Sequence, residues 1–77
     1  MIPEANKYYQ LHYVDNEFPI YSYIGSGRFT GKTTVVEGTE ETVYLFDNLF
    51  SQKGYTNEAY FSEKNIQNVV AVPTNVG

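Results

Sequence analysis

The stretch that decides the fold runs from Ala59 to Val72 and reads AYFSEKNIQNVVAV. It contains a short apolar run, a polar break and a second apolar run that ends before Pro73. This order is typical of a strand, a tight turn or single 3₁₀ turn, and a further strand. Ile66 is the one apolar residue inside the polar break, so we expect Ile66 and Phe61 to be buried at the end of a core.

Upstream, residues 7–14 alternate between two faces, which is the period of a half-buried strand. The face expected to meet the core carries Tyr9, Leu11 and Tyr13. Asp15-Asn16-Glu17 follows as a turn, because Asp and Asn side chains hydrogen-bond to nearby backbone and tolerate unusual φ values.

Residues 18–24 resume the alternation and predict a second strand, paired with the first as an antiparallel hairpin. Pro19 cannot donate a ladder hydrogen bond, which places it at the start or the edge of that strand. The face expected toward the core carries Phe18, Ile20 and Ile24. The tyrosines expected to face away from the core are Tyr8, Tyr21, Tyr23 and Tyr44.

Three glycines in residues 25–31 indicate a loop or a strongly bent strand. The Gly31-Lys32-Thr33 sequence invites comparison with a phosphate-binding loop, but the Walker A pattern needs a glycine where this chain has Ser26. We therefore interpret the segment as a glycine-rich turn between strands, followed by a β-prone run over residues 32–37.

Two interpretations fit residues 37–54. In the first, residues 37–40 form a hairpin turn and residues 41–46 the return strand, followed by a wider loop. In the second, a helix covers residues 40–53, with two glutamates in its first turn and Lys53-Gly54 at its end. The first gives an all-β fold and the second an α+β fold.

A chain of 77 residues forms one domain, 1–77. We favour an all-β fold, a small bent antiparallel sheet or an SH3-like partly open barrel of roughly five to six strands. The strand–turn–strand ending at residues 59–72 is similar in shape to the ending of SH3-like barrels, and this resemblance assigns no family and no site. The alternative is α+β, with one helix at about 40–53 packed on the sheet.

Composition limits the chemistry and the location. The chain has no Cys, and His12 is its single histidine, so a metal site is poorly supplied. No serine lies in a nucleophile-elbow context. We expect no enzyme activity and no cofactor. There is neither a signal peptide nor a long apolar run, so we expect a cytoplasmic protein without a membrane span.

Two charged segments are candidate binding sites. Arg28 and Lys32 flank Phe29 in the glycine-rich segment, and basic groups next to an aromatic ring can bind phosphates and stack on bases. This supports an alternative function, nucleotide or single-stranded nucleic-acid binding through residues 25–33, although the net charge of −4 opposes it. The second segment is an acidic face that would meet a basic partner, formed by Glu37, Glu40, Glu41 and Asp47.

The eight tyrosines favour a protein-binding surface, because Tyr is enriched where proteins meet. We expect the partner-binding residues to be Tyr21, Tyr23, Arg28, Phe29 and Lys32, with the two tyrosines as anchors on one strand face. In composition the chain resembles accessory proteins of phages and mobile elements. That resemblance implies a small non-catalytic module that inhibits or modulates a host macromolecule, with a host protein as its partner.

Overall fold

The computed structural model describes residues 1–51 and 54–71 of the chain. In sequence order the elements are β1 (Tyr8–Tyr13), η1 (Pro19–Tyr21), β2 (Tyr23–Val35), β3 (Thr42–Ser51), β4 (Gly54–Ser62), η2 (Glu63–Asn65) and β5 (Ile66–Val70), where η is a 3₁₀ turn. The prediction of an all-β fold is confirmed. The alternative with a helix over residues 40–53 is wrong, because residues 42–51 of that range form the strand β3. Residues 52 and 53 lie outside the described part of the chain.

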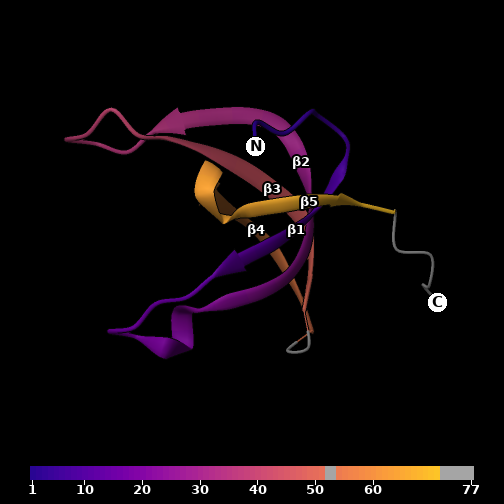
Figure 1. Cartoon of the computed structure of the whole chain (residues 1–77), viewed down its shortest axis with the longest axis horizontal. Helices are drawn as coiled ribbons and strands as arrows, with labels where there is room; N and C mark the ends of the chain where they lie inside the picture. Colours follow the sequence, from indigo (N-terminus) through magenta and orange to yellow (C-terminus); the bar gives the residue numbers. More distant parts are fainter. Residues whose placement is uncertain (52–53, 72–77) are drawn as a thin grey trace.

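The five strands form one open antiparallel sheet in the order β4-β3-β2-β1-β5. Figure 1 shows that β2 bends strongly. Its first half, residues 23–28, pairs with β1, and β3 pairs with it from Gly25 to Val35. The two edge strands, β4 and β5, are joined through η2. The predicted order of strand, 3₁₀ turn and strand over residues 59–70 is therefore confirmed.

The glycine-rich segment 25–31 lies inside β2, so the bent-strand expectation is confirmed and the turn between strands is wrong. A Cβ added at Gly27 would lie 3.0 Å from Leu11 and would also collide with Leu49. Gly31 has φ +96 and lies where the pairing of β2 with β3 changes register. These glycines let the strand bend closely over its neighbours without breaking the ladders.

The hairpin turn predicted at residues 37–40 is confirmed. The carbonyl of Val36 accepts hydrogen bonds from the Thr39 backbone N–H at 3.0 Å and from its Oγ1 at 2.8 Å, and Gly38 has φ +83. The return strand continues to Ser51, so the wider loop expected around Asn48 is wrong. Asn48 stays inside β3 at φ +49, where the register of the β2–β3 pairing shifts, and Leu49 is buried in the core.

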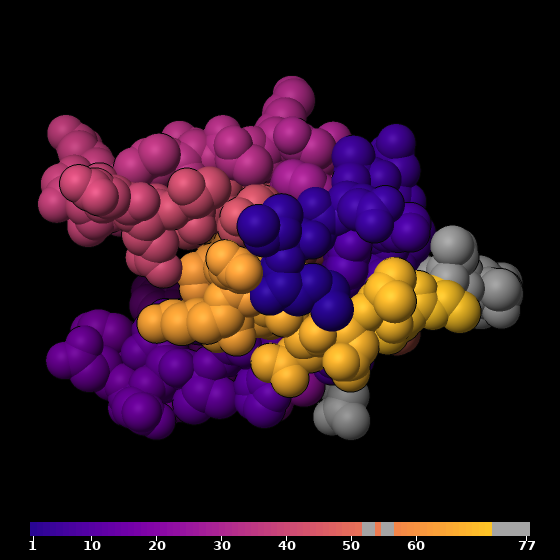
Figure 2. All heavy atoms as spheres, turned by 45° about the horizontal axis from the view of Figure 1, so that its top comes forward, coloured from indigo at the N-terminus to yellow at the C-terminus, as the bar shows by residue number. Residues whose placement is uncertain are grey.

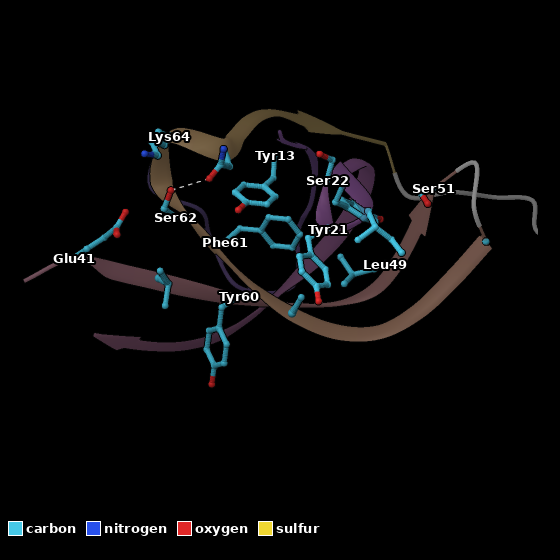
Figure 3. A pocket seen from close by; sticks show the side chains of 16 residues that line it. Tyr13, Tyr21, Ser22, Glu41, Leu49, Ser51, Tyr60, Phe61, Ser62 and Lys64 are labelled. Carbon is cyan, nitrogen blue, oxygen red and sulfur yellow. Dashed lines mark hydrogen bonds between the residues drawn. The ribbon is translucent and has the colours of Figure 1, made fainter. Parts of the chain in front are cut away.

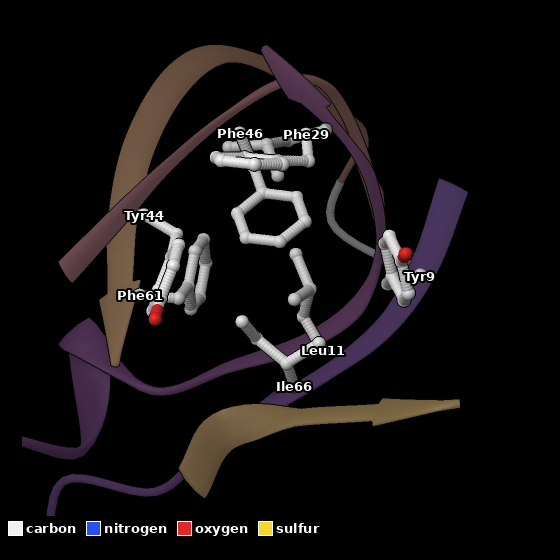
Figure 4. Packing of buried hydrophobic residues seen from close by; sticks show 8 residues of the cluster. Tyr9, Leu11, Phe29, Tyr44, Phe46, Phe61 and Ile66 are labelled. Carbon is white, nitrogen blue, oxygen red and sulfur yellow. The ribbon is translucent and has the colours of Figure 1, made fainter. Parts of the chain in front are cut away.

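Buried aromatic rings dominate the core, which contains Tyr9, Leu11, Phe29, Tyr44, Phe46, Leu49, Phe61 and Ile66. Phe46 is fully buried at the centre, with its ring centroid 5.6 to 6.1 Å from those of Phe29, Phe61 and Tyr9 (Figure 4). Such ring pairs add to the free energy gained by burial alone. The predicted burial of Phe61, Ile66, Tyr9 and Leu11 is confirmed.

Tyr44 corrects one prediction of facing. We expected its ring to point away from the core, but it is buried and its centroid lies 5.6 Å from that of Phe29. The sequence left both a strand and a helix open for this segment, so it did not determine which of its side chains face the core. In the structure Tyr44 on β3 lies opposite Phe61 on β4, so both side chains point to the same face of the sheet, which is the core face.

The predicted antiparallel hairpin is confirmed, since β1 pairs with β2, but of residues 18–24 only Tyr23 and Ile24 lie in the second strand. Pro19 to Tyr21 form η1 instead, and pairing of β2 with β1 begins at Tyr23 opposite Tyr13. One reason is that the Asp15 turn extends further than expected, since Asp15 Oδ1 accepts from the backbone N–H groups of Glu17 at 3.0 Å and Phe18 at 2.9 Å. The predicted core residues of this segment, which are exposed instead, are Phe18, Ile20 and Ile24.

Candidate functional site

Two exposed segments extend from the same side of the molecule, with η2 between them (Figure 1). The acidic arm is the end of the β2–β3 hairpin, residues 32–42, all of which are exposed. The aromatic arm is the connection between β1 and β2, residues 14–22. Figure 2 shows the surface indented between these arms, next to the residues of β4 and η2 drawn in orange.

This indentation is a hollow of about 700 Å³, within the range of small ligand-binding pockets. Its lining includes Tyr13, Ile20, Tyr21, Tyr23, Glu41, Val43, Leu49, Ala59, Tyr60, Phe61 and Lys64. Figure 3 shows the rings of Tyr13, Tyr21 and Phe61 grouped around it. The side that faces the core is therefore apolar and aromatic, and the rim toward η2 and the acidic arm is polar.

The aromatic arm presents large side chains to solvent beside the hollow. Tyr21 is 67% exposed and Ile20 is 77% exposed, and both line the hollow. The ring of Tyr21 lies 5.9 Å from that of Phe18. Residues 18–21 thus present three large exposed apolar side chains, and such surfaces commonly mark contact sites.

Asp15 ties the aromatic arm to the sheet. Its backbone N–H donates to Ser22 Oγ at 2.8 Å, and its Oδ2 accepts from the Tyr13 hydroxyl at 3.0 Å. Hydrogen bonds from the Phe18 backbone and the Tyr13 hydroxyl hold the pKa of Asp15 below its usual range. The same bond to the carboxylate raises the pKa of Tyr13. The arm is thus held by a fixed set of hydrogen bonds.

Tyr23, which we expected to face away from the core, is instead partly buried against the core cluster. It forms the wall of the hollow that continues into the core. Its ring lies 5.5 Å from that of Phe61, and its hydroxyl donates to the carbonyl of Ser26 at 3.0 Å. Burial raises the pKa of Tyr23 to about 12, although a backbone hydrogen bond from Phe50 acts in the opposite direction. Tyr21 and Tyr23 both line the hollow, but they come from η1 and β2 rather than from one strand face.

Carboxylates outnumber cations around the hollow. Glu41 lines it, and Glu37 and Glu40 lie on the acidic arm. In the part of the chain that the structure describes, none of these three carboxylates has a cation within ion-pair distance. Lys64 is the single basic side chain among the described lining residues.

Asp47, the fourth residue of the expected acidic face, lies elsewhere and is neutralised. It faces Arg28 across β3 and β2, and two hydrogen bonds join the pair, from Nε to Oδ1 at 2.9 Å and from Nη2 to Oδ2 at 2.6 Å. These bonds hold the pKa of Asp47 below its usual range and raise that of Arg28. The acidic face is therefore limited to the three glutamates of the arm.

The basic segment predicted to bind phosphates is not assembled. Arg28 is engaged by Asp47, and its Nη1 lies 3.4 Å from Asn6 Oδ1. Phe29 is only 5% exposed, because it packs against Phe46 and Tyr44, so its ring cannot stack on a base. Lys32 is exposed on the acidic arm. None of these three residues lines the hollow with Tyr21 and Tyr23.

Several residues of the hollow were missed by the sequence analysis, namely Tyr13, Ile20, Leu49, Tyr60 and Phe61. Three of the five, Tyr13, Ile20 and Phe61, were interpreted only as core, and Leu49 and Tyr60 were assigned no role. Pro19 was the available signal, because proline at the start of a 3₁₀ turn would have moved Ile20 and Tyr21 out of the strand pattern.

Within residues 1–51 and 54–71, no group of three or more His, Asp or Glu side chains is arranged to hold a metal ion. None of the helical turns in these ranges has the length and hydropathy of a membrane span. Comparison of the chain with protein-family models, with curated proteins and with solved structures gave no match.

Proposed function

We propose that this protein is a small non-catalytic protein-binding module that holds its partner in the hollow between the two arms. The observation that carries this proposal is the exposure of Tyr21 and Ile20 at the edge of a concave surface with an aromatic floor. Exposed aromatic side chains next to a pocket are typical anchors of protein interfaces, and truncating one commonly costs 2 kcal/mol or more.

Charge indicates what kind of partner fits. Glu41 lines the hollow, Glu37 and Glu40 extend beyond it, and the net charge of the chain is −4. A partner surface with Lys or Arg around a large apolar side chain would complement this arrangement, and opposite charges would also speed association. A module of this kind acts by covering part of its partner, which agrees with the expectation of an inhibitor or modulator of a host protein.

Site-specific photo-crosslinking tests the proposal. We would replace Tyr21 by a benzophenone amino acid, irradiate the protein in a cell lysate, and identify crosslinked products by mass spectrometry. We expect a discrete protein partner to be crosslinked from position 21. Treating the lysate with nuclease should leave this product unchanged.

The matched control places the same photoreactive residue at Val69, which is similarly exposed on β5 and does not line the hollow. The proposal is wrong if the two positions give the same products or if position 21 gives none. Loss of the product after nuclease treatment would instead indicate a nucleic-acid-dependent partner.

A further inference from the structure

We propose that the partner enters as an extended basic segment that pairs with the free edge of β4 as a sixth strand and places a large apolar side chain in the hollow. This inference rests on the proposed function and specifies its binding mode. Strand addition of this type obtains affinity from main-chain hydrogen bonds and specificity from alternate side chains.

The free edge of β4 is the first requirement. β4 is at one end of the strand order and, in the described residues, its backbone pairs only with β3. The strand runs from Gly54 to Ser62, nine residues, whereas the other edge strand, β5, has five. An edge of this length presents a row of unpaired N–H and C=O groups, which is a template for another strand.

The position of the hollow is the second requirement. Tyr60 and Phe61 are consecutive residues of β4, so their side chains point to opposite faces of the sheet, as Figure 3 shows. Both line the hollow. A space that contacts both faces of one strand must lie along its edge. The hollow is therefore located where an added strand would pair with β4.

The opposite wall explains why the site is a groove rather than a flat edge. It is formed by Ile20, Tyr21, Ser22 and Tyr23. The first two belong to η1, which offers side chains and no extended backbone. An added strand would therefore pair with β4 through its backbone. Its side chains on the inner face would meet Tyr21 and Phe61.

The charges favour a basic partner over a second copy of this chain. Glu58 is exposed at the midpoint of the nine-residue β4. If two copies paired antiparallel about that midpoint, Glu58 would lie opposite Glu58, and like charges directly opposite are destabilising. Each copy would also bring a net charge of −4. A Lys or Arg opposite Glu58 removes this repulsion and forms a favourable cross-strand pair.

The test uses displayed random peptides of about twelve residues, long enough to span β4 in an extended conformation, selected on the immobilised 77-residue chain. We expect enriched peptides in which Lys or Arg alternates with apolar residues. With an enriched peptide bound, alternate backbone amides of residues 54–62 should exchange at least about tenfold more slowly by NMR, because they acquire hydrogen-bond partners. The amides of β5 should not change.

Two variants separate backbone pairing from side-chain binding. The same peptide with N-methyl groups at alternate residues keeps its side chains but loses the donors. It should bind at least about tenfold more weakly, because several main-chain hydrogen bonds to β4 are lost. Glu58→Lys should weaken binding, whereas Glu63→Lys, on η2, is the matched control that should change binding less.

The outcomes distinguish the inference from the function on which it rests. If no peptide is enriched and no partner is crosslinked from position 21, both are wrong. If peptides bind but β4 amides stay unprotected and N-methylation has no effect, strand addition is wrong and the protein-binding function stands. If β4 amides are protected without peptide and light scattering gives a dimer, the occupant of the edge is a second copy and the inference is overturned.

Discussion

The ring of Tyr23, at the start of β2, packs against the ring of Phe61, near the end of β4, with centroids 5.5 Å apart. β2 and β4 are separated by β3 in the sheet, so no ladder joins them. Side-chain packing therefore holds together the two sides of the curled sheet. The same contact forms the wall of the hollow, which couples the shape of the site to the core.

Truncating the buried side chains of Phe61 or Ile66 should leave much of the protein unfolded. Phe61→Ala and Ile66→Ala each remove a buried side chain that packs in the central cluster, and each should lower the free energy of unfolding by roughly 2–5 kcal/mol. Urea denaturation followed by circular dichroism measures the change. Val69→Ala, at an exposed position of β5, should stay within about 0.5 kcal/mol of the parent. Parent-like curves for both buried variants would contradict the described core.

Variants of Tyr21 and Tyr23, two of the tyrosines that line the hollow, should separate the effects on binding and on stability. Tyr21→Ala removes an exposed ring, so it should lose partner binding by roughly thirtyfold while the melting temperature stays near that of the parent. Tyr23→Ala removes the contact with Phe61 and the hydrogen bond to Ser26, so it should lower the melting temperature as well. Thermal melts and binding titrations check both. Early melting of Tyr21→Ala would mean that its ring supports the fold.

Alkaline pH should destabilise the protein in part through Tyr23. Its pKa is raised to about 12 in the folded state, against about 10 for an unfolded chain. A group with a raised folded pKa contributes stability that is complete below the unfolded pKa and is lost as pH rises through the folded value. The free energy of unfolding should therefore fall between about pH 10 and 12, and Tyr23→Phe should show a smaller fall.

In Tyr23→Phe the fall of the free energy of unfolding with rising pH should become smaller rather than vanish, because the pKa of Tyr13 is also raised by its hydrogen bond to Asp15. Tyr23→Phe itself should cost about 1 kcal/mol at neutral pH, since it loses the hydrogen bond to Ser26. Denaturant titrations at several pH values give both quantities. If the free energy of unfolding falls equally with pH in the parent and in Tyr23→Phe, this role for Tyr23 is ruled out.

The cross-strand ion pair should couple β2 and β3. Arg28→Gln, Asp47→Asn and the double variant form a cycle, and we expect a coupling energy of roughly 1 kcal/mol at pH 7, because the pair is bidentate but partly exposed. The folded pKa of Asp47 is lowered, so this stability is present above about pH 4 and is lost as pH falls below it.

The pair of Glu4 and Lys7 provides the comparison for this cycle. Its single 3.4 Å contact lies between two exposed side chains, and its coupling energy should be smaller. Chemical denaturation at pH 7 and pH 3 measures both cycles. A coupling energy for Arg28 and Asp47 that is zero at pH 7, or unchanged at pH 3, would contradict the assignment.

A methyl group should not be tolerated where β2 passes over the core. A Cβ at Gly27 would lie 3.0 Å from Leu11 and 3.4 Å from Phe46, so Gly27→Ala should cost roughly 1–3 kcal/mol by overpacking. Thr34→Ala, at an exposed position of the same strand, should have a small effect. Equal stability of the two variants in urea denaturation would mean that β2 can move away from its neighbours without cost.

The sequence by itself determined the parts of the fold that depend on local alternation. Tyr9 and Leu11 were placed correctly in the core because period two over residues 7–14 has one apolar face. Phe61 and Ile66 were placed correctly because a polar break with a single apolar residue leaves few alternatives. The turns at Asp15 and at residues 37–40 followed from side-chain chemistry within a few residues.

The tertiary structure decided what depended on partners distant in the sequence. Glycine is a local signal for a break, yet Gly27 lies in a continuous strand because β1 pairs with it on one side and Leu49 packs over it. The hollow was beyond sequence reasoning for the same reason, since Tyr21, Tyr60 and Glu41 line it from three separate segments. The bend of β2 brings those segments together. The glycines of residues 25–31 indicated a bend, but which segments meet across it depends on packing between residues distant in the chain.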